Sequence, residues 1–296
     1  MIATRIVRTL PVLPPRRSDG HKGDYGRVLV LAGSTGMVGA AALTGDAALR
    51  AGAGLATVAT PKSVYPVLAA KLTCCTTLSM PETRTGTLSN RSARRILALA
   101  KDFDVVALGP GLGRHAETTR LVHALVRNVP LPMVIDADGL NALAENVAVL
   151  AKAKGPRIVT PHPGEMARLL DCSTEAVQRD RRKAAVGFAR RHSVAVLLKG
   201  YRTIVTDGKR VHINKTGNPG MATGGTGDVL TGVVAGLLAQ GLLPFDAARL
   251  GAHVHGLAGD IAAKEIGEVS LLATDVLDAL PQAFMKSTKN RKKVRR

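Results

Sequence analysis

Aromatic side chains are scarce in this chain of 296 residues. Phe, Trp and Tyr together make up 2% of it, and there is no tryptophan. Proteins that bind single-stranded nucleic acid stack the bases on aromatic side chains. Because the chain has little material for such a surface, we expect no specific nucleic-acid partner.

Acidic residues are also few, with 22 Asp and Glu against 41 Lys and Arg, and the formal net charge is +19. The segment 286–296 contains seven of the positive charges and no acid, which leaves +12 for the rest. Such a basic run is usually disordered and can add loose affinity for acidic surfaces. The remaining positive charge favours an enzyme that binds anions.

Cysteines and long apolar runs are rare as well. Cys74 and Cys75 are adjacent and cannot form an ordinary disulfide, and neither they nor Cys172 has the spacing of a metal site. We expect buried thiols in a reducing compartment. No apolar run approaches the ~20 residues of a membrane span, and the N-terminus lacks the apolar core of a signal peptide. These absences predict a cytoplasmic protein without a membrane partner.

From Arg27 onward, short β-branched runs alternate with Ala- and Leu-rich amphipathic stretches. This alternation predicts an α/β fold with a mostly parallel central sheet and helices on both faces. The expected strands are Val28–Leu31, Ala56–Ala59, Val105–Leu108, Met133–Ile135, Ile158–Thr160 and Val194–Leu198. The expected helices are Val38–Ala51, Ser89–Ala100, Thr118–Val126, Thr174–Arg191, Gly227–Gln240, Pro244–Ala263 and Thr274–Met285.

Two further short runs, Ile204–Thr206 and Val211–Ile213, flank a turn and predict an antiparallel hairpin appended to the sheet. We find no internal linker and no repeat. A single domain is therefore expected over residues 21–285. It would lie between a flexible N-terminal extension, residues 1–20, and a disordered basic tail, residues 286–296.

Most loops marked by glycine and proline follow a predicted strand. Ligands of open α/β sheets bind outside the carboxyl ends of the strands, so we expect these loops to converge on one site. There are six of them, at residues 32–41, 108–114, 136–143, 160–170, 198–203 and 218–232.

The last loop is the most informative, because its glycines lead directly into Asp228 and then into an apolar helix. A glycine-rich loop at a helix N-terminus offers free N–H groups and the positive end of the helix dipole, which suit a phosphate. A carboxylate repels phosphate, so simple anion binding does not explain Asp228. It is explained if Asp228 takes a proton from a hydroxyl that attacks the phosphorus while Gly225 to Gly227 hold the transferring group. The alternative is that Asp228 only caps the helix.

Two other glycine-rich loops have weaker signals. Gly33, Gly36 and Gly39 have the wrong spacing for a dinucleotide fingerprint, so a nicotinamide-dependent dehydrogenase is disfavoured. The loop around Gly111 either brings backbone N–H groups to a ligand or only turns the chain.

Polar and charged residues in two of the other loops have both functional and structural interpretations. Asp136 and Asp138, with Asn141, could hold hydrated Mg²⁺, or Asp138 could cap a helix. His162, between two prolines, could bond a ligand, and Glu165 could polarise metal-bound water or only compensate a helix dipole.

Lys199 ends a buried strand, where its charge needs either a phosphate or an internal carboxylate. Gly200 and Thr203 would leave room and a hydroxyl for the same anion. Lys215 is a further candidate for contact with phosphate.

Five motifs in this order resemble the ADP/ATP-dependent NAD(P)H-hydrate dehydratase family, whose members share the ribokinase-like fold. They are HKGDYG (21–26), GPGLG (109–113), TPHPGE (160–165), LKG (198–200) and NPGMATGGTGD (218–228). The resemblance extends over nearly the whole globular part, from His21 to Leu280.

The resemblance implies repair of nicotinamide cofactors whose reduced ring has taken up water at C6, by a hydro-lyase. A nucleotide, most often ADP, would phosphorylate the hydroxyl of the S-epimer of NADHX or NADPHX. Departure of phosphate would regenerate NADH or NADPH, with AMP and phosphate as the other products and Mg²⁺ as the metal. ADP against ATP, and NADHX against NADPHX, are not decided by the sequence.

The resemblance also assigns roles to residues. Asp228 would be the base. The nucleotide-binding residues would be Lys199, Gly200, Tyr201, Arg202, Thr203, Gly225, Thr226 and Gly227. The hydrate would be lined by Ala41, Gly111, Asn141, His162 and Asp228, and Glu165 would contact the metal through water.

A homotetramer is likewise implied, and, because nothing of an epimerase domain precedes Arg27, a stand-alone dehydratase. Two other functions stay open. A ribokinase-like kinase of a vitamin-precursor alcohol would keep Asp228 as base but give a stable phosphoester. A nucleic-acid-associated protein would use the basic cluster Arg291–Arg296.

Overall fold

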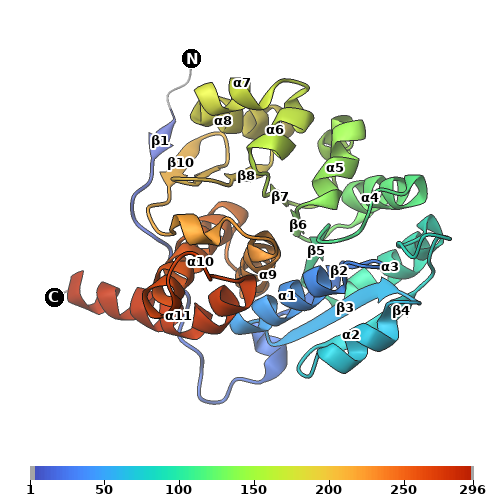
Figure 1. Cartoon of the computed structure of the whole chain (residues 1–296), viewed down its shortest axis with the longest axis horizontal. Helices are drawn as coiled ribbons and strands as arrows, with labels where there is room; N and C mark the ends of the chain where they lie inside the picture. Colours follow the sequence, from blue (N-terminus) through green and yellow to red (C-terminus); the bar gives the residue numbers. More distant parts are fainter. Residues whose placement is uncertain (1–3, 295–296) are drawn as a thin grey trace.

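The computed structural model of the chain describes residues 4–294, with side chains as far as Thr288. A ten-stranded sheet forms its centre and carries helices on both faces (Figure 1). In spatial order the strands are β1 (Arg5–Ile6), β10 (Arg210–Ile213), β9 (Ile204–Thr206), β8 (Ala195–Leu198), β7 (Arg157–Val159), β6 (Met133–Ile135), β5 (Val105–Leu108), β2 (Arg27–Leu31), β3 (Leu55–Pro61) and β4 (Thr76–Met80). Neighbouring strands are parallel except at β10–β9 and β9–β8. The predicted α/β sheet with an appended antiparallel hairpin is confirmed.

Successive side chains of each strand point to opposite faces, and both faces are covered. Val28 and Val30 belong to one hydrophobic core, whereas Leu29 and Leu31 belong to the other. Burial on both sides is the reason that these strands read as continuous apolar runs.

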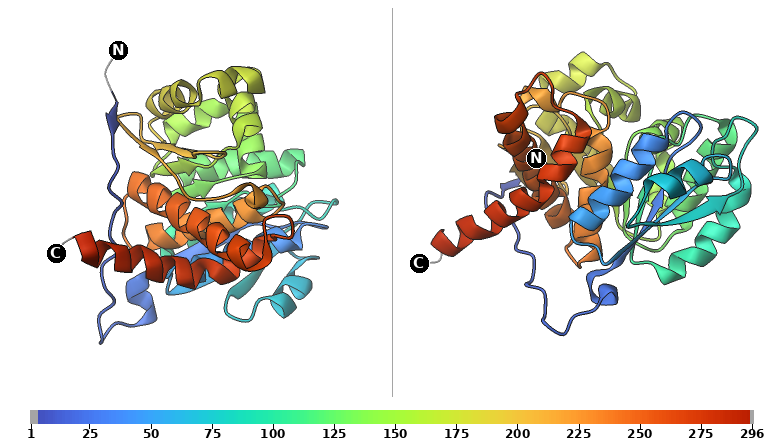
Figure 2. Two further views of the ribbon diagram at one scale, coloured as in Figure 1. Left: turned by 60° about the vertical axis from the view of Figure 1, so that its left-hand side comes forward. Right: turned by 60° about the horizontal axis from the view of Figure 1, so that its bottom comes forward.

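The helices divide between the two cores. One core is covered by α1 (Val38–Arg50), α2 (Tyr65–Lys71), α9 (Thr226–Ala239), α10 (Pro244–Ile266) and α11 (Ala273–Val294). The other is covered by α3 (Ala93–Leu99), α4 (Ala116–Asn128), α5 (Asp138–Glu145), α6 (Pro163–Leu170), α7 (Thr174–Arg179) and α8 (Arg181–His192). Short 3-10 helices connect them at η1 (Lys22–Tyr25), η2 (Asn90–Ser92), η3 (Ala100–Asp102), η4 (Val147–Lys152) and η5 (Pro219–Met221). Figure 2 shows α10 and α11 side by side on the first of these faces.

Helices α1 and α9 pack through very small side chains. A Cβ atom added to Gly232 of α9 would collide with the Thr44 carbonyl of α1, and one added to Gly236 would collide with the Ala48 carbonyl. Close approach of this kind requires glycine. It fixes the N-terminus of α9, and with it the glycine-rich loop, against α1.

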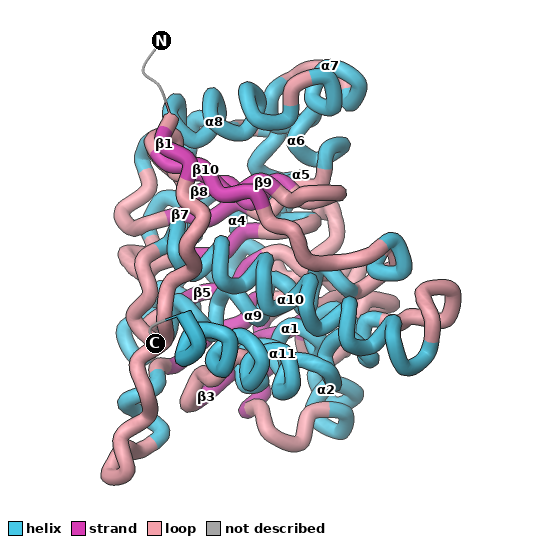
Figure 3. The backbone as a smooth tube through the Cα atoms, turned by 90° about the vertical axis from the view of Figure 1, so that its left-hand side faces the viewer, coloured by secondary structure: helices cyan, strands magenta, loops and turns pink. Residues whose placement is uncertain are grey.

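Both ends of the chain contain regular structure within the described residues. Strand β1 pairs with β10, and the side chains of His212 and Arg16 bond the backbone oxygens of Val7 and Gly52 at 2.9 and 2.7 Å. Within the extension, expected to be flexible, β1 lies at the edge of the sheet and the chain then runs on to η1 (Figure 3). Most of the tail 286–296, expected to be disordered, continues α11 to Val294. Residues 1–3 and 295–296 lie outside the described residues.

Some elements differ from the expectation for local reasons. The edge strand β4 and the short helix α2 are additional, because neither the polar sequence TTLSM nor a helix of only seven residues gives a clear apolar pattern. The helix expected over Thr174–Arg191 is divided, since the Asp180 carboxylate accepts from the Lys183 N–H at 2.8 Å and begins α8 anew. Cys74 and Cys172 are exposed in loops, so the expectation of buried thiols is wrong for both.

None of the helices within residues 4–294 is long and apolar enough to cross a membrane.

Replacement of Gly232 by alanine is expected to destabilise the fold by about 1–3 kcal/mol, because the added methyl group forces α1 and α9 apart. Gly187 of α8 is a matched control, since a Cβ atom there meets nothing within 4 Å. Gly187→Ala should stabilise the protein by about 0.5–1 kcal/mol through lower backbone entropy of the unfolded chain. Urea unfolding of both variants measures the difference, and equal effects would contradict the packing described for α9.

Candidate active site

The six loops predicted to converge do meet at the carboxyl edge of the sheet. Hydrogen bonds join them in pairs: Gly33 N–H to Pro110 O (2.9 Å), Ser34 Oγ to Gly111 O (2.8 Å), Gly113 N–H to Asp138 Oδ2 (2.9 Å), Lys199 N–H to Pro161 O (2.8 Å) and Thr231 Oγ1 to Asp136 Oδ2 (2.8 Å). The convergence expected from the topology of parallel sheets is confirmed.

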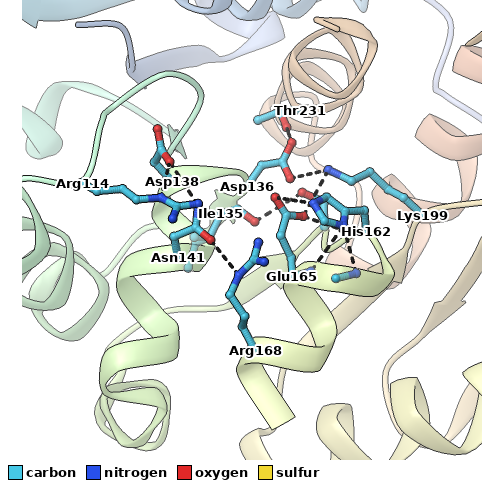
Figure 4. Close-up of polar contacts among 12 residues, drawn as sticks. Arg114, Ile135, Asp136, Asp138, Asn141, His162, Glu165, Arg168, Lys199 and Thr231 are labelled. Atoms are coloured by element: carbon cyan, nitrogen blue, oxygen red, sulfur yellow. Dashed lines mark hydrogen bonds and ion pairs between the residues drawn. The ribbon is translucent and has the colours of Figure 1, made fainter. Parts of the chain in front are cut away.

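The centre of the site is an ion pair between Lys199 and Asp136 (Figure 4). The Lys199 Nζ atom lies 2.7 Å from Asp136 Oδ1 and 3.7 Å from Glu165 Oε2. Asp136 is 1% exposed, and the side chain of Lys199 is 20% exposed. Of the two alternatives for the lysine charge, the structure contains the internal carboxylate.

Burial opposes the charge of Lys199, but Asp136 and Glu165 outweigh it and raise the Lys199 pKa above its ordinary value. The ammonium is therefore charged at neutral pH. Removal of one partner from such a pair leaves an uncompensated buried charge, which is strongly unfavourable.

Asp228 lies in the first turn of α9, beside this pair. Burial and then the Asp136 carboxylate raise the pKa of Asp228 to about 7, while Lys199 opposes part of the rise. The N-cap residue of α9 is Gly225, at φ 92°, so Asp228 is not the cap that the alternative interpretation proposed. A carboxyl group with a pKa near neutrality is suited to accept a proton from a substrate hydroxyl.

The glycine-rich loop leaves space in front of the helix. A Cβ atom on Gly224 would meet nothing within 4 Å, whereas one on Gly227 would lie 3.4 Å from the Lys199 Nζ atom. The Thr226 hydroxyl is within 3.0 Å of the Met221 and Thr223 carbonyls, so it is used within the loop. The donor that Thr226 has left for an anion is its backbone N–H.

The turn expected to bind the nucleotide follows β8. Gly200 has φ 124° and Arg202 has φ 53°, so two residues of this turn are left-handed. The Thr203 hydroxyl donates to the Gly200 carbonyl at 3.0 Å. The side chains of Tyr201 and Arg202 are exposed at the rim.

Of the residues expected to line the hydrate, Asn141, Gly111 and Ala41 have the following contacts. Asn141 donates to Asp138 at 3.1 Å and accepts from Arg168 at 3.1 Å. The Gly111 carbonyl accepts from Ser34. Ala41 is fully buried in α1, so its side chain belongs to the core and is not presented to the site.

His162 and Glu165 form a reciprocal cap at the start of α6. The Nδ1 atom of His162 accepts from the Gly164 and Glu165 N–H groups at 3.0 and 3.3 Å, and Glu165 accepts from the His162 N–H at 2.8 Å. Burial lowers the pKa of His162 and raises that of Glu165. Dipole compensation is therefore one real role of Glu165, alongside its contact with Lys199.

A dedicated metal cage is absent from the described residues, where no three His, Cys, Asp or Glu side chains form a ligand set. Asp136 is engaged by Lys199 and Thr231, and Asp138 accepts from the Gly113 N–H of another loop, so it does not act as a cap for its own helix. Mg²⁺ commonly uses one or two carboxylates together with waters and substrate phosphates. The carboxylates of the site have the chemistry for a metal of this second kind.

Three residues of the site were not predicted from the sequence. Thr231 lies one helical turn after Asp228, a spacing that could have identified it. The Arg114 Nε atom lies 3.7 Å from Asp138 Oδ1, and Arg168 bonds Asn141, so two arginines lie beside Asp138 and Asn141. In the sequence, Arg114 is marked only as a basic residue after a glycine-rich loop, and Arg168 only as a basic residue in the last turn of a helix.

Comparison with known proteins identifies the family. A family model described as NAD(P)H-hydrate dehydratase matches residues 28–282. The chain belongs to this family. The bifunctional NAD(P)H-hydrate repair enzyme Nnr of Moorella thermoacetica is 51% identical over 271 residues, which are 91% of this chain and 51% of that protein. The chain thus spans about half the length of the curated relatives it matches.

Solved structures of NAD(P)H-hydrate dehydratases have the same fold. The ADP/ATP-dependent NAD(P)H-hydrate dehydratase from Bacillus subtilis, co-crystallised with ATP and Mg²⁺, has a TM-score of 0.77 at 31% identity, over 93% of this chain and 94% of that one. A ribokinase-like superfamily protein from Enterococcus faecalis also has a TM-score of 0.77, at 27% identity, over 93% and 92%. The expected ribokinase-like fold is confirmed.

Asp228→Asn is expected to stabilise the protein, and more at about pH 8 than at about pH 5. Since the pKa of Asp228 is raised from 3.8 to about 7, the folded state binds more protons than the unfolded state in that window, and stability falls as pH rises through it. Asparagine does not titrate and removes this effect. Thermal unfolding at both pH values measures it, with the exposed Asp278→Asn as control. An equal change at both pH values would show that the Asp228 pKa is ordinary.

Proposed function

We propose that the protein dehydrates the S-epimer of NADHX or NADPHX to NADH or NADPH, with a nucleotide, ADP in the first place, as phosphoryl donor. AMP and phosphate are the other products. The observation that carries the proposal is a carboxyl group with a pKa near 7, Asp228, at the open N-terminus of α9 and next to the ammonium of Lys199.

In the first step, Asp228 takes the proton of the C6 hydroxyl. The hydroxyl oxygen forms a bond to the β-phosphorus of ADP, and the bond from that phosphorus to the bridging oxygen breaks, so AMP leaves with the electron pair. The N–H groups of Gly225 to Gly227 and the Lys199 ammonium stabilise the charge on the transferring group.

In the second step, the C6–O bond breaks and phosphate leaves. Phosphate is a far better leaving group than hydroxide, which is the reason for the phosphorylation. Loss of the C5 proton then forms the C5–C6 double bond of the reduced nicotinamide. The sum is conversion of hydrate and ADP to NADH or NADPH, AMP and phosphate, with no oxidation.

Positions in the site follow from this chemistry. The turn Lys199–Thr203 and the loop Gly225–Gly227 bind the nucleotide, while Asn141, His162 and Gly111 border the hydrate. A bound Mg²⁺ would neutralise phosphate charge, with Glu165 as its contact through water. Preference for ADP, homotetrameric assembly and a cytoplasmic location belong to the same proposal and rest on the resemblance of the motifs.

The kinase of a vitamin-precursor alcohol is not favoured, because the family model and the curated relatives are NAD(P)H-hydrate dehydratases and repair enzymes. A nucleic-acid role has no support in the described residues, and the side chains of Arg291–Arg296 lie outside them.

Incubation of NADHX with the protein, ADP and Mg²⁺ should restore the absorbance of the reduced nicotinamide, with one AMP and one phosphate per NADH. Asp228→Asn should lower this turnover by about 10²–10⁴-fold, since general-base catalysis is lost, and leave ADP affinity within about threefold. Asp278→Asn should retain full activity.

Absence of nucleotide-dependent recovery would contradict the proposed activity, and a phosphoester that accumulates without elimination would favour the kinase. Full activity in Asp228→Asn would contradict only the assignment of the base.

A further inference from the structure

The turn after β8 is held from outside the site by one arginine. Arg181, the first residue of α8, donates from Nη2 to the carbonyls of Leu198 and Lys199 at 3.1 and 2.8 Å, and from Nη1 to the carbonyl of Tyr201. Its planar guanidinium thereby bonds three carbonyls within four consecutive residues. No single-point cation such as lysine can reproduce this arrangement.

Arg181 occupies this position at an energetic cost. Burial lowers its pKa, and its Nε atom is buried without a hydrogen-bond partner among the described residues. The ion pairs within residues 4–288 do not include Arg181, so carbonyl dipoles compensate its charge. A buried donor left unpaired in this way calls for an explanation beyond fold stability.

The conformation of the turn needs such support. Gly200 and Arg202 are both left-handed, and the second is not a glycine, so the turn is strained. A Cβ atom on Gly200 would lie 3.1 Å from the Arg181 Nη2 atom, so the guanidinium is packed directly against the turn. Within the turn itself, the Thr203 hydroxyl also donates a hydrogen bond to the Gly200 carbonyl.

Lys199 has two supports besides the bond from Arg181 to its carbonyl. Its Nζ atom is bonded to Asp136, and its N–H donates to the Pro161 carbonyl. Loss of Arg181 would therefore displace Gly200 to Thr203 more than the Lys199 ammonium. Lys199 therefore keeps its bonds to Asp136 and Pro161 when Arg181 is replaced, whereas the Tyr201 carbonyl of the turn loses its bond.

We infer that Arg181 is a positioning residue for the nucleotide: it holds Gly200 to Thr203 in the conformation that receives the nucleoside diphosphate, without touching the ligand. This inference rests on the proposed function, in which that turn binds the nucleotide. Because Lys199 and Asp228 keep their own supports, Arg181 acts on nucleotide affinity and not on the chemical step.

A second arginine that bonds backbone carbonyls, and that is more deeply buried than Arg181, provides a control. Arg157, 2% exposed, donates to the carbonyls of Val126, Val129, Leu131 and Pro156. It begins β7 and so lies at the amino edge of the sheet, opposite the site. The two arginines have the same chemistry, and only Arg181 adjoins the nucleotide turn.

The experiment compares Arg181→Met with Arg157→Met in urea unfolding, ADP binding and steady-state kinetics. Both variants should lose stability. Arg181→Met should raise the Kd and KM for ADP by about tenfold or more, as expected for loss of several hydrogen bonds to charged groups, with kcat at saturating ADP and KM for the hydrate within about threefold. Arg157→Met should bind ADP with wild-type affinity. Methylguanidinium at non-denaturing concentration should restore ADP affinity in Arg181→Ala and leave the wild type unchanged.

Wild-type ADP affinity in Arg181→Met, or an equal loss in Arg157→Met, would overturn the inference. If Arg181→Met does not fold, Arg181→Lys decides in its place, because it keeps the charge but not the three bonds, and it should still weaken ADP binding several-fold. Failure of the wild-type protein to bind ADP would instead refute the proposed function.

Discussion

The ion pair between Lys199 and Asp136 is the interaction on which the site depends. It joins the ends of β8 and β6, and the second oxygen of Asp136 accepts from Thr231 on α9, so three elements meet at one carboxylate. Neither charge could be buried here without the other. The pair therefore fixes an ammonium next to Gly227, at the helix terminus that faces an anion, and places a negative charge near Asp228.

The arrangement places negative charge near the proposed base and positive charge near the proposed phosphate position, and the proposed chemistry needs both. The carboxylates of Asp136 and Glu165 raise the pKa of Asp228 after burial has already done so, which prepares a base that titrates near neutrality. The ammonium and the first N–H groups of α9 supply positive charge on the side where phosphate would arrive. Packing of α9 against α1 through Gly232 and Gly236 fixes the position of the N-terminus of α9. Such close helix packing uses small side chains, and the chain has few aromatic ones.

The sequence predicts the strands at the centre of the sheet well, because strands buried on both faces are apolar throughout: β5 and β6 have the expected bounds. It does not predict β4, which is polar and lies at an edge, or β1, which depends on pairing with a strand about 200 residues away. The loops of the site could be located, because ends of parallel strands share an edge. The partner of Lys199 could not be chosen, since a phosphate and a carboxylate satisfy the same requirement. Arg181 carried no signal, because its role arises from carbonyls exposed by a strained turn.

The most direct test of the central claim is the pH dependence of kcat/KM for NADHX in the wild type and in Asp136→Asn. The account predicts a rise of kcat/KM with pH and an apparent pKa of about 7 in the wild type, because Asp228 must be ionised to act as a base. In Asp136→Asn, the loss of a like charge and the release of Lys199 should lower the apparent pKa of this rise by about one unit or more. An unchanged apparent pKa in Asp136→Asn would contradict the claim that the ion pair controls the ionisation of Asp228.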